Sequence, residues 1–196
     1  MESILLSLLA ILAQDVPAPQ RDSAGVPPVP PPVAQERADC TQPTYASDML
    51  VCASPELLAL DAKMASLLPS EGIGSEANGP ALLESQSDWF KRRSMCAFQA
   101  RHAECLRAAY DERISVLEAL AGRRDGNTRT CTRKGPLQGA ELVLMANGAA
   151  IAWRSGAPVA AGLWRFDPGI WRPFISVFPA KSSWTVQLPG GRKTSC

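Results

Sequence analysis

Six cysteines constrain this chain more than any other feature of its sequence; they are Cys40, Cys52, Cys96, Cys105, Cys131 and Cys196. None of them forms a Cys-x-x-Cys pair, and zinc sites usually draw their ligands from such close pairs, so the spacing disfavours a metal site. An even number of cysteines in an oxidising compartment indicates a disulfide framework instead. We therefore expect all six cysteines to be joined in disulfide bonds.

The N-terminal segment predicts such a compartment. Residues 4–13 read ILLSLLAILA, a nearly unbroken apolar run. This run is too short to span a membrane, which takes about 20 residues, but it suits the core of a secretory signal. Ala13 has the small side chain that precedes a cleavage site. We expect residues 1–13 to be a signal peptide, the mature protein to be periplasmic or secreted, and no integral membrane span to remain after cleavage.

A proline-rich segment follows. Seven of the eighteen residues from Val16 to Val33 are proline. Proline has no N–H to offer a helix or a sheet, so this stretch favours extended polyproline II structure. We expect residues 14–38 to form a semi-rigid linker.

Helical signals occupy residues 39–122. Ser54-Pro55-Glu56 is a strong helix start, because serine caps free N–H groups and proline fits the first turn. Leucine and methionine then recur at helical spacing as far as Leu68. A second helical pattern runs from Pro80 to Gly122, which would make a helix of about 60 Å. A break between Cys96 and Cys105 is plausible for that reason, but no glycine or proline lies there, so the sequence leaves the point open.

Folding these two helical stretches into an antiparallel hairpin around residues 72–79 suggests a disulfide pairing. Cys52 lies about as far before that turn as Cys96 lies after it, so these two can meet. Cys40 would then reach Cys105 in an outer bridge. Bridges of this kind suit a small domain with a thin core, where each contributes about 2–4 kcal/mol.

The helical region resembles the LprI-type lysozyme inhibitor N-terminal domain family, over about residues 39–120. The motifs that carry the resemblance are Cys52-Ala53-Ser54-Pro55-Glu56-Leu57 with Leu60-Asp61, then Gln86, Trp89, Arg93 and Cys96, then Cys105-Leu106, Tyr110, Arg113 and Leu117. The acidic residue usual before the first helix corresponds here only to Asp48. The resemblance implies a small, secreted, disulfide-stapled helical domain of a bacterial envelope and, for some members, inhibition of c-type lysozymes.

We interpret the motif residues as structural: Pro55, Leu57, Asp61, Gln86, Trp89, Arg93, Leu106, Tyr110 and Arg113. Trp89 and Tyr110 are expected to fill the helix interface. Asp61 is expected to form an internal ion pair with Arg93 or Arg113, because a glycosidase needs two carboxylates and no partner is evident.

Two polar features of the helical region are interpreted as solvated surface. His102 stands among polar residues, and Lys91-Arg92-Arg93 is a basic run of a kind that usually lies on an exposed helix face.

The sequence pattern of residues 127–196 predicts a small antiparallel β domain, either a sandwich or a barrel. Asn147-Gly148 is the favoured dipeptide of a two-residue hairpin turn. The expected strands are Ala140–Ala146, Ala149–Arg154, Val159–Phe166, Trp171–Phe178 and Ser183–Leu188. A bridge from Cys131 to Cys196 would join the two ends of this region. Gly190-Gly191-Arg192-Lys193 lacks the full phosphate-loop pattern and is expected to be a turn. The region resembles no family that we recognise.

The overall class expected is therefore α+β: a disulfide-stapled helical hairpin or bundle at 39–122, followed by a small β domain at 127–196. No nucleophile–base pair, metal-ligand cluster or cofactor fingerprint is evident in the sequence. We expect a binding protein without catalytic activity, cofactor or metal. Tryptophans 153, 164, 171 and 184 could stack on sugars, but core packing is the commoner role.

The sequence suggests two alternative kinds of binding partner. The first is a c-type lysozyme, blocked sterically and approached through an acidic inhibitor face. The alternative is an envelope interaction module that binds peptidoglycan, anionic lipid or a periplasmic protein through basic residues of the strand region: Arg123, Arg124, Arg129, Arg133 and Lys134. A solvated linker face is the other interpretation of these basic residues.

The formal net charge of +1 excludes an obvious nucleic-acid binder, but it hides an uneven distribution. Residues 1–39 carry two basic and five acidic groups, residues 40–122 seven and eleven, and residues 123–196 eleven and three. An acidic helical region is thus joined to a basic strand region. The two either face different partners or lie against each other.

Overall fold

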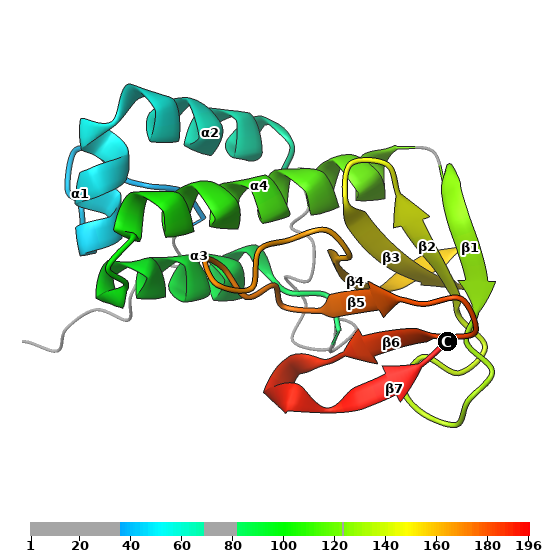
Figure 1. Cartoon of the computed structure of the whole chain (residues 1–196). Helices are drawn as coiled ribbons and strands as arrows, with labels where there is room; N and C mark the ends of the chain where they lie inside the picture. Colours follow the sequence, from blue (N-terminus) through cyan, green and yellow to red (C-terminus); the bar gives the residue numbers. More distant parts are fainter. Residues whose placement is uncertain (1–35, 69–81, 123) are drawn as a thin grey trace, which may run out of the picture. The chain divides into compact units, whose positions relative to one another are not determined.

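The computed structural model describes residues 36–68, 82–122 and 124–196 (Figure 1). The expected signal peptide, nearly all of the proline-rich linker and the turn expected near residues 72–79 lie outside this part of the chain. The described residues hold four α-helices and a seven-stranded sheet, cross-linked by three disulfides, so the α+β class is confirmed. None of the helices in these ranges combines the length and the apolar content needed to cross a bilayer.

The described residues form four α-helices, α1 Ala46–Ala53, α2 Pro55–Ser66, α3 Gln86–Ser94 and α4 His102–Ala121, with a short 3₁₀-helix, η1, at Met95–Phe98. Of these, α2 and α3 begin at serine caps, Ser54 and Ser85. Helix α2 starts as predicted, because the Ser54 hydroxyl accepts a hydrogen bond from the Leu57 N–H at 3.4 Å. Helix α1 was not predicted, since eight residues are too few for a clear periodicity.

The single long helix considered for residues 80–122 is broken. Helix α3 ends at Ser94, and the chain tightens into η1 before α4 begins at His102. Gln99 has extended backbone angles (φ −103°, ψ 142°), so the chain reverses without glycine or proline. Helices α3 and α4 therefore form a helical hairpin, and α2 also packs against α4. The turn of the hairpin expected around residues 72–79 lies outside the described residues.

Two predicted disulfides are wrong for this reason. The structure joins Cys40 to Cys52 and Cys96 to Cys105, instead of Cys52 to Cys96 and Cys40 to Cys105. Each bond closes a local loop, with sequence separations of 12 and 9 residues. Cys52 lies on α1, which turns back toward Cys40, while the second bond pins the reversal between α3 and α4. The third disulfide joins Cys131 to Cys196, the pair expected at the ends of the strand region.

The strand region is one sheet in which each strand pairs with its sequence neighbour. The strands are β1 Gly126–Thr130, β2 Glu141–Met145, β3 Ala149–Arg154, β4 Ala157–Leu163, β5 Ser176–Pro179, β6 Trp184–Gln187 and β7 Lys193–Ser195. Asn147-Gly148 makes the predicted hairpin turn between β2 and β3, where Gly148 has φ +92°. The expected turn at residues 190–191 links β6 to β7.

One pairing departs from the antiparallel expectation. Strands β4 and β5 run parallel, with Leu163 opposite Ser176. The segment between them, residues 164–175, leaves the sheet and reaches toward α3 and α4 before it returns (Figure 1). Parallel neighbours need such a crossover, so Trp171–Ile175 is loop instead of the predicted strand.

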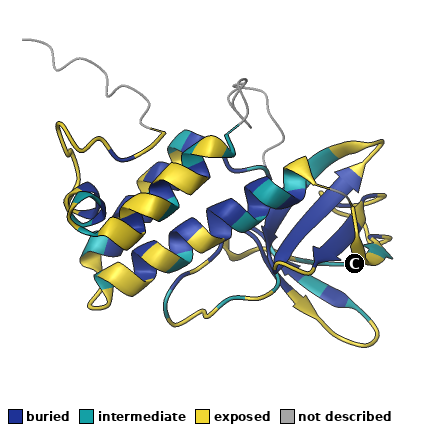
Figure 2. Ribbon diagram, turned by 90° about the horizontal axis from the view of Figure 1, so that it is seen from above, coloured by how far each residue is buried: buried dark blue, intermediate teal, exposed yellow. Residues whose placement is uncertain are grey.

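Helix α4 covers one face of the sheet. Alternate residues of β2 and β3, such as Val143 and Ile151, pack against Val116 and Ala119 of α4. Their neighbours, such as Leu142 and Ala152, point into a second cluster on the other face. Figure 2 shows these strands dark blue because both faces are buried. The helical and strand regions thus lie against each other within one compact unit, Ala34–Cys196.

Candidate binding surface

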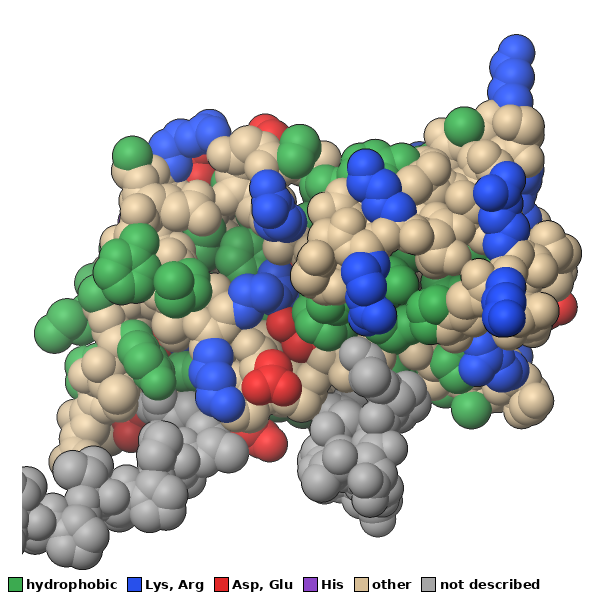
Figure 3. Space-filling model, turned by 90° about the horizontal axis from the view of Figure 1, so that it is seen from below, with side chains coloured by type: hydrophobic (Ala, Val, Ile, Leu, Met, Phe, Trp, Pro, Cys, Tyr) green, Lys and Arg blue, Asp and Glu red, His purple; other side chains and the backbone are tan. Residues whose placement is uncertain are grey.

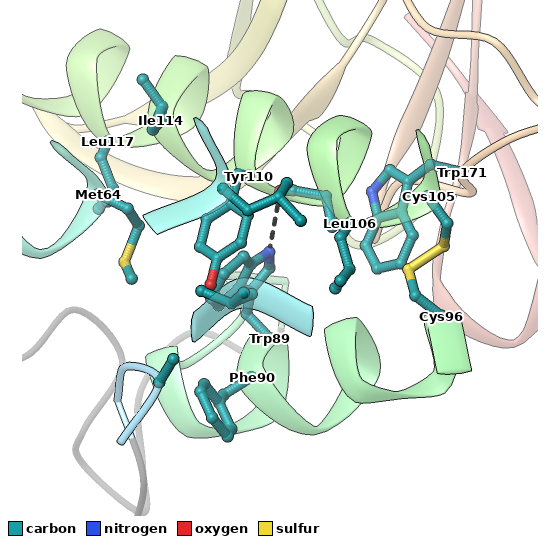
Figure 4. Close-up of a cluster of buried hydrophobic side chains, with 14 residues drawn as sticks. Met64, Trp89, Phe90, Cys96, Cys105, Leu106, Tyr110, Ile114, Leu117 and Trp171 are labelled. Carbon is teal, nitrogen blue, oxygen red and sulfur yellow. Dashed lines mark hydrogen bonds between the residues drawn. A yellow bond between two sulfur atoms is a disulfide. The ribbon is translucent and has the colours of Figure 1, made fainter. Parts of the chain in front are cut away.

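The motif residues lie in the interior of the helical region. Trp89 and Tyr110 have no exposed surface and meet edge to face, with ring centroids 5.4 Å apart (Figure 4). The indole N–H of Trp89 donates to the Ala109 carbonyl at 3.3 Å. Leu57 and Leu106 belong to the same cluster, and Pro55 is the first residue of α2. These residues hold the helices together and present little to a partner.

A buried polar chain runs through this core. Arg93 pairs with Asp48 and donates to the Tyr110 hydroxyl at 3.1 Å, and that hydroxyl donates to Asp61 at 2.9 Å. Burial raises the pKa of Tyr110, which keeps its proton available for this donation. The predicted pairing of Asp61 with Arg93 or Arg113 is wrong. Asp61 instead faces Arg37, with N–O 3.7 Å, and touches Arg93 only through the tyrosine.

Gln86 and Arg113 form a second buried pair. The Arg113 Nε donates to the Gln86 side-chain oxygen at 2.7 Å, and its Nη1 donates to the Glu84 carbonyl at 3.1 Å. Burial lowers the pKa of Arg113 to about 10, so the side chain stays charged at neutral pH. This pair fixes the chain where it enters α3.

The basic run at 91–93 is not a solvated face. Only Lys91 is exposed, whereas Arg93 is fully buried and Arg92 is partly covered. Arg92 donates two hydrogen bonds of 2.6 Å to Glu84 and one of 2.9 Å to Glu112. Burial raises the pKa of Glu84. Sequence reasoning missed this because acidic partners eight and twenty residues away leave no local signal.

Glu112 connects the helices to the strand region. Besides Arg92, it accepts hydrogen bonds from the indole N–H of Trp171 and, at 3.0 Å, from the backbone N–H of Phe174. Trp171 packs into the helical core, near Leu106 and the Cys96–Cys105 bond (Figure 4). The helical core is therefore completed by a side chain from the strand region.

His102 also departs from its expected role. Its Nε2 lies 3.1 Å from the hydroxyl of buried Ser47, which itself donates to the Ser94 carbonyl at 3.2 Å. Burial, and then the charge of Arg93, lower the pKa of His102. The ring therefore links α1 to the start of α4 instead of being simply solvated.

Tryptophan in the strand region is covered by arginine. The guanidinium-to-ring distances are 4.4 Å for Arg92 and Trp171, 3.9 Å for Arg124 and Trp153, 5.2 Å for Arg129 and Trp184, and 4.1 Å for Arg165 and Trp164. Two of the basic residues considered as envelope contacts, Arg124 and Arg129, are thus engaged within the protein. Arg133 and Lys134 are exposed, and Arg123 lies outside the described residues.

Of the six large apolar side chains that are exposed in the described residues, four lie on or next to α1 and η1, and the other two are Leu58 of α2 and Phe178 of β5. We name the first four residues the α1–η1 patch: Tyr45, Met49, Met95 and Phe98, which are 37, 60, 58 and 82% exposed. Seen from below, hydrophobic side chains collect over the helical half while Lys and Arg are spread over the strand half (Figure 3). Phe98 sits in the reversal that the Cys96–Cys105 bond closes. This patch could not be predicted from the sequence, because neither α1 nor η1 was predicted.

Most acidic side chains in the described part of the helical region are paired with a basic side chain. Buried Asp48, Glu84 and Glu112 are paired with arginine. Four further acids of the helices are paired as well: Glu56 with Arg107, Asp88 with Lys91 at 3.5 Å, Glu104 with Arg101 at 3.3 Å, and Glu118 with Lys63 at 2.9 Å. Asp111 is exposed on α4 and is not among these pairs. Within the described ranges, no three His, Cys, Asp or Glu side chains meet as a set of metal ligands.

Comparison with known proteins finds a distant likeness. The chain is 28% identical over 111 residues to lipoprotein LprI of Mycobacterium tuberculosis, and equally to lipoprotein LprI of Mycobacterium bovis. The aligned part covers 57% of this chain and 55% of each relative, so the chain spans about half the length of the relatives it matches. No protein-family model matches the chain. No solved structure matches it.

Proposed function

We propose, from the likeness to lipoprotein LprI, that this chain is an envelope binding protein that blocks c-type lysozyme sterically and has no catalytic activity of its own. The distant sequence similarity carries this proposal, together with the LprI-type motifs at residues 52–117. Three disulfides are compatible with a periplasmic or secreted location, where a lysozyme would be met.

The α1–η1 patch is the contact surface that this function would use. Binding hot spots are dominated by large side chains that become buried at the centre of an interface. Phe98 and Met95 are large, exposed and held on a disulfide-closed turn, so little conformational freedom would be lost on docking. Because most acids of the described helices are already paired, apolar contact supports the proposal better than the attraction of a basic lysozyme to an acidic face.

The direct test is lysis of bacterial cell walls by a c-type lysozyme, followed as loss of turbidity. We expect the purified chain, with its disulfides formed, to slow lysis at about micromolar concentration. Heat-denatured, reduced protein is the control. Undiminished lysis at that concentration would reject the proposed function.

Phe98→Ala should weaken the inhibition roughly 30-fold, as truncation of a hot-spot side chain costs about 2 kcal/mol of binding. The stability of the variant should be unchanged, since the ring is 82% exposed. Phe178→Ala is the matched control, because that ring is 46% exposed but lies on β5, away from the patch. Equal inhibition by both variants would place the contact elsewhere.

The alternative, an envelope interaction module, is supported by charge. Residues 124–196 carry ten basic and three acidic side chains. Five of the basic ones are exposed near the Cys131–Cys196 bond and the β6–β7 turn: Arg133, Lys134, Lys181, Arg192 and Lys193. Co-sedimentation with purified peptidoglycan tests this function, and absence of the protein from the pellet would reject it.

A further inference from the structure

A groove lies where the end of the helical hairpin meets the strand region, and it is distinct from the α1–η1 patch except at Met95. Its volume is about 600 Å³, within the range of small-molecule sites, which is about 300–1,000 Å³. Three segments form it: Arg92 to Gln99, Trp171 to Ser176, and Gln187 to Gly191. The groove is therefore built by elements that only the folded joint between the two regions brings together.

The groove combines an apolar floor with amide side chains. Met95, Phe174 and Pro189 contribute apolar surface that is at least partly exposed. Gln187 lies opposite Ser176 in the β5–β6 register, so these two polar side chains stand next to each other on one wall. Side-chain amides both donate and accept hydrogen bonds, which suits a ligand that carries peptide or acetamido groups.

The charge of the groove has one sign. Its lining residues include Arg92 and Arg172 and no acidic residue. Arg92 is paired with Glu84 and Glu112. Among the described residues, none forms an ion pair or hydrogen bond with the guanidinium of the exposed Arg172, whose carbonyl accepts a hydrogen bond from Arg92 at 2.9 Å. Arg192 and Lys193 follow directly after the lining residue Gly191 and add positive charge nearby. A ligand with a carboxylate fits this arrangement, and Arg172 is the side chain available to bind it.

The geometry points to a binding site for a muramyl peptide that carries a carboxylate. Such a fragment of the bacterial cell wall consists of an acetamido sugar with a short acidic peptide attached. Each chemical group of this ligand has a partner in the groove. The sugar face and the methyl groups would contact the apolar floor, the amides would bind Gln99 and Gln187, and the carboxylate would bind Arg172. This site does not depend on lysozyme inhibition, because its ligand is a fragment of the wall and its residues lie outside the proposed lysozyme contact apart from Met95.

The test is calorimetric titration of the purified full chain with N-acetylmuramyl-L-alanyl-D-isoglutamine, with amide NMR shifts to locate the site. We expect saturable binding with a Kd below about 1 mM and shifts at Gly190 and Gly191. Tri-N-acetylchitotriose, which has no carboxylate, should bind at least about 10-fold more weakly, since it cannot form the charge-assisted bond.

Two variants identify the residues. Arg172→Gln should weaken binding of the muramyl peptide about 10-fold, and Gln187→Ala should also weaken it. Arg133→Gln removes the same charge outside the groove and should leave the Kd unchanged. The far-ultraviolet circular dichroism of all three should match that of the parent chain.

Three results would overturn the assignment. The first is the absence of both binding heat and NMR shifts at about 5 mM ligand, a concentration at which a site with a Kd of about 1 mM would be mostly filled. The second is that Arg172→Gln and Arg133→Gln weaken binding of the muramyl peptide equally. The third is that L-alanyl-D-isoglutamine, which lacks the sugar, binds with the same affinity as the muramyl peptide. The last result would make the occupant an acidic peptide. Lysis inhibition is measured separately, so failure of either proposal is visible without the other.

Discussion

Asp48→Ala is expected to lower the free energy of unfolding by about 3–5 kcal/mol, because it leaves the buried charge of Arg93 without its counter-ion. Asp48 and Arg93 both have side chains with no exposed surface. Asp48 also accepts a hydrogen bond at 3.3 Å from the Tyr45 backbone N–H at the start of α1. The substitution therefore removes an ion partner and a helix cap together, and equilibrium unfolding in urea measures the loss.

The matched control is Glu118→Ala. Glu118 bridges α4 to Lys63 of α2 at 2.9 Å, but both side chains are exposed, 38 and 53% respectively. Exposed pairs contribute about 0–1 kcal/mol, so this variant should unfold almost as the parent does. A similar loss in both variants would show that burial is not what makes the Asp48–Arg93 pair important.

A double variant separates the unpaired charge from lost packing. In Asp48→Ala/Arg93→Met no charge remains to be buried, and methionine can fill much of the space beside Phe90 that the arginine occupies. We expect the double variant to be more stable than Asp48→Ala alone. If it is less stable, the guanidinium contributes through its contact with Tyr110 more than through Asp48.

Apart from the Cys131–Cys196 disulfide, which joins residues 65 apart, the features that sequence reasoning predicted correctly have local causes. The start of α2 depends on Ser54 and Pro55, and the β2–β3 turn depends on Asn147-Gly148. In both cases the residues that specify the geometry are the residues that adopt it. A helix cap or a tight turn can therefore be read without knowing what packs around it.

The features that it missed have no turn or capping signal in the residues around them. The reversal between α3 and α4 has no glycine or proline, and it is closed by the Cys96–Cys105 bond. Once that reversal is missed, Cys96 and Cys105 are placed on one continuous helix, and both are paired with the wrong cysteines. The buried state of Arg92 and Arg93 was missed similarly, because Glu84, Glu112 and Asp48 come from other elements. A charged run looks the same in sequence whether solvent or carboxylates surround it.

The crossover from β4 to β5 explains why the helical and strand regions cannot be treated as independent. It carries Trp171 into the helical core, where the side chain is 5% exposed and its N–H reaches Glu112. Trp171→Ala is expected to lower the free energy of unfolding by about 3–5 kcal/mol, the usual range for emptying a buried tryptophan site. The loss should appear as one cooperative transition in both helical and aromatic circular dichroism, because the cavity opens within a core that the two regions share.

Trp164→Ala is the control for this prediction. Trp164 comes from the same crossover, its N–H donates to the Met145 carbonyl at 2.8 Å, and its ring is only half-buried, so its loss should cost about 1–2 kcal/mol. Trp171→Phe separates packing from hydrogen bonding, since the ring largely remains while Glu112 loses one donor, for an expected cost of about 1–3 kcal/mol. In Trp171→Ala, the helical and aromatic signals could change in separate unfolding transitions, with the helical transition at the same position as in the parent chain. That result would mean that the helices are stable without the strand region. A single, earlier transition would instead show that Trp171 is as much part of the helical core as the motif residues Trp89 and Tyr110.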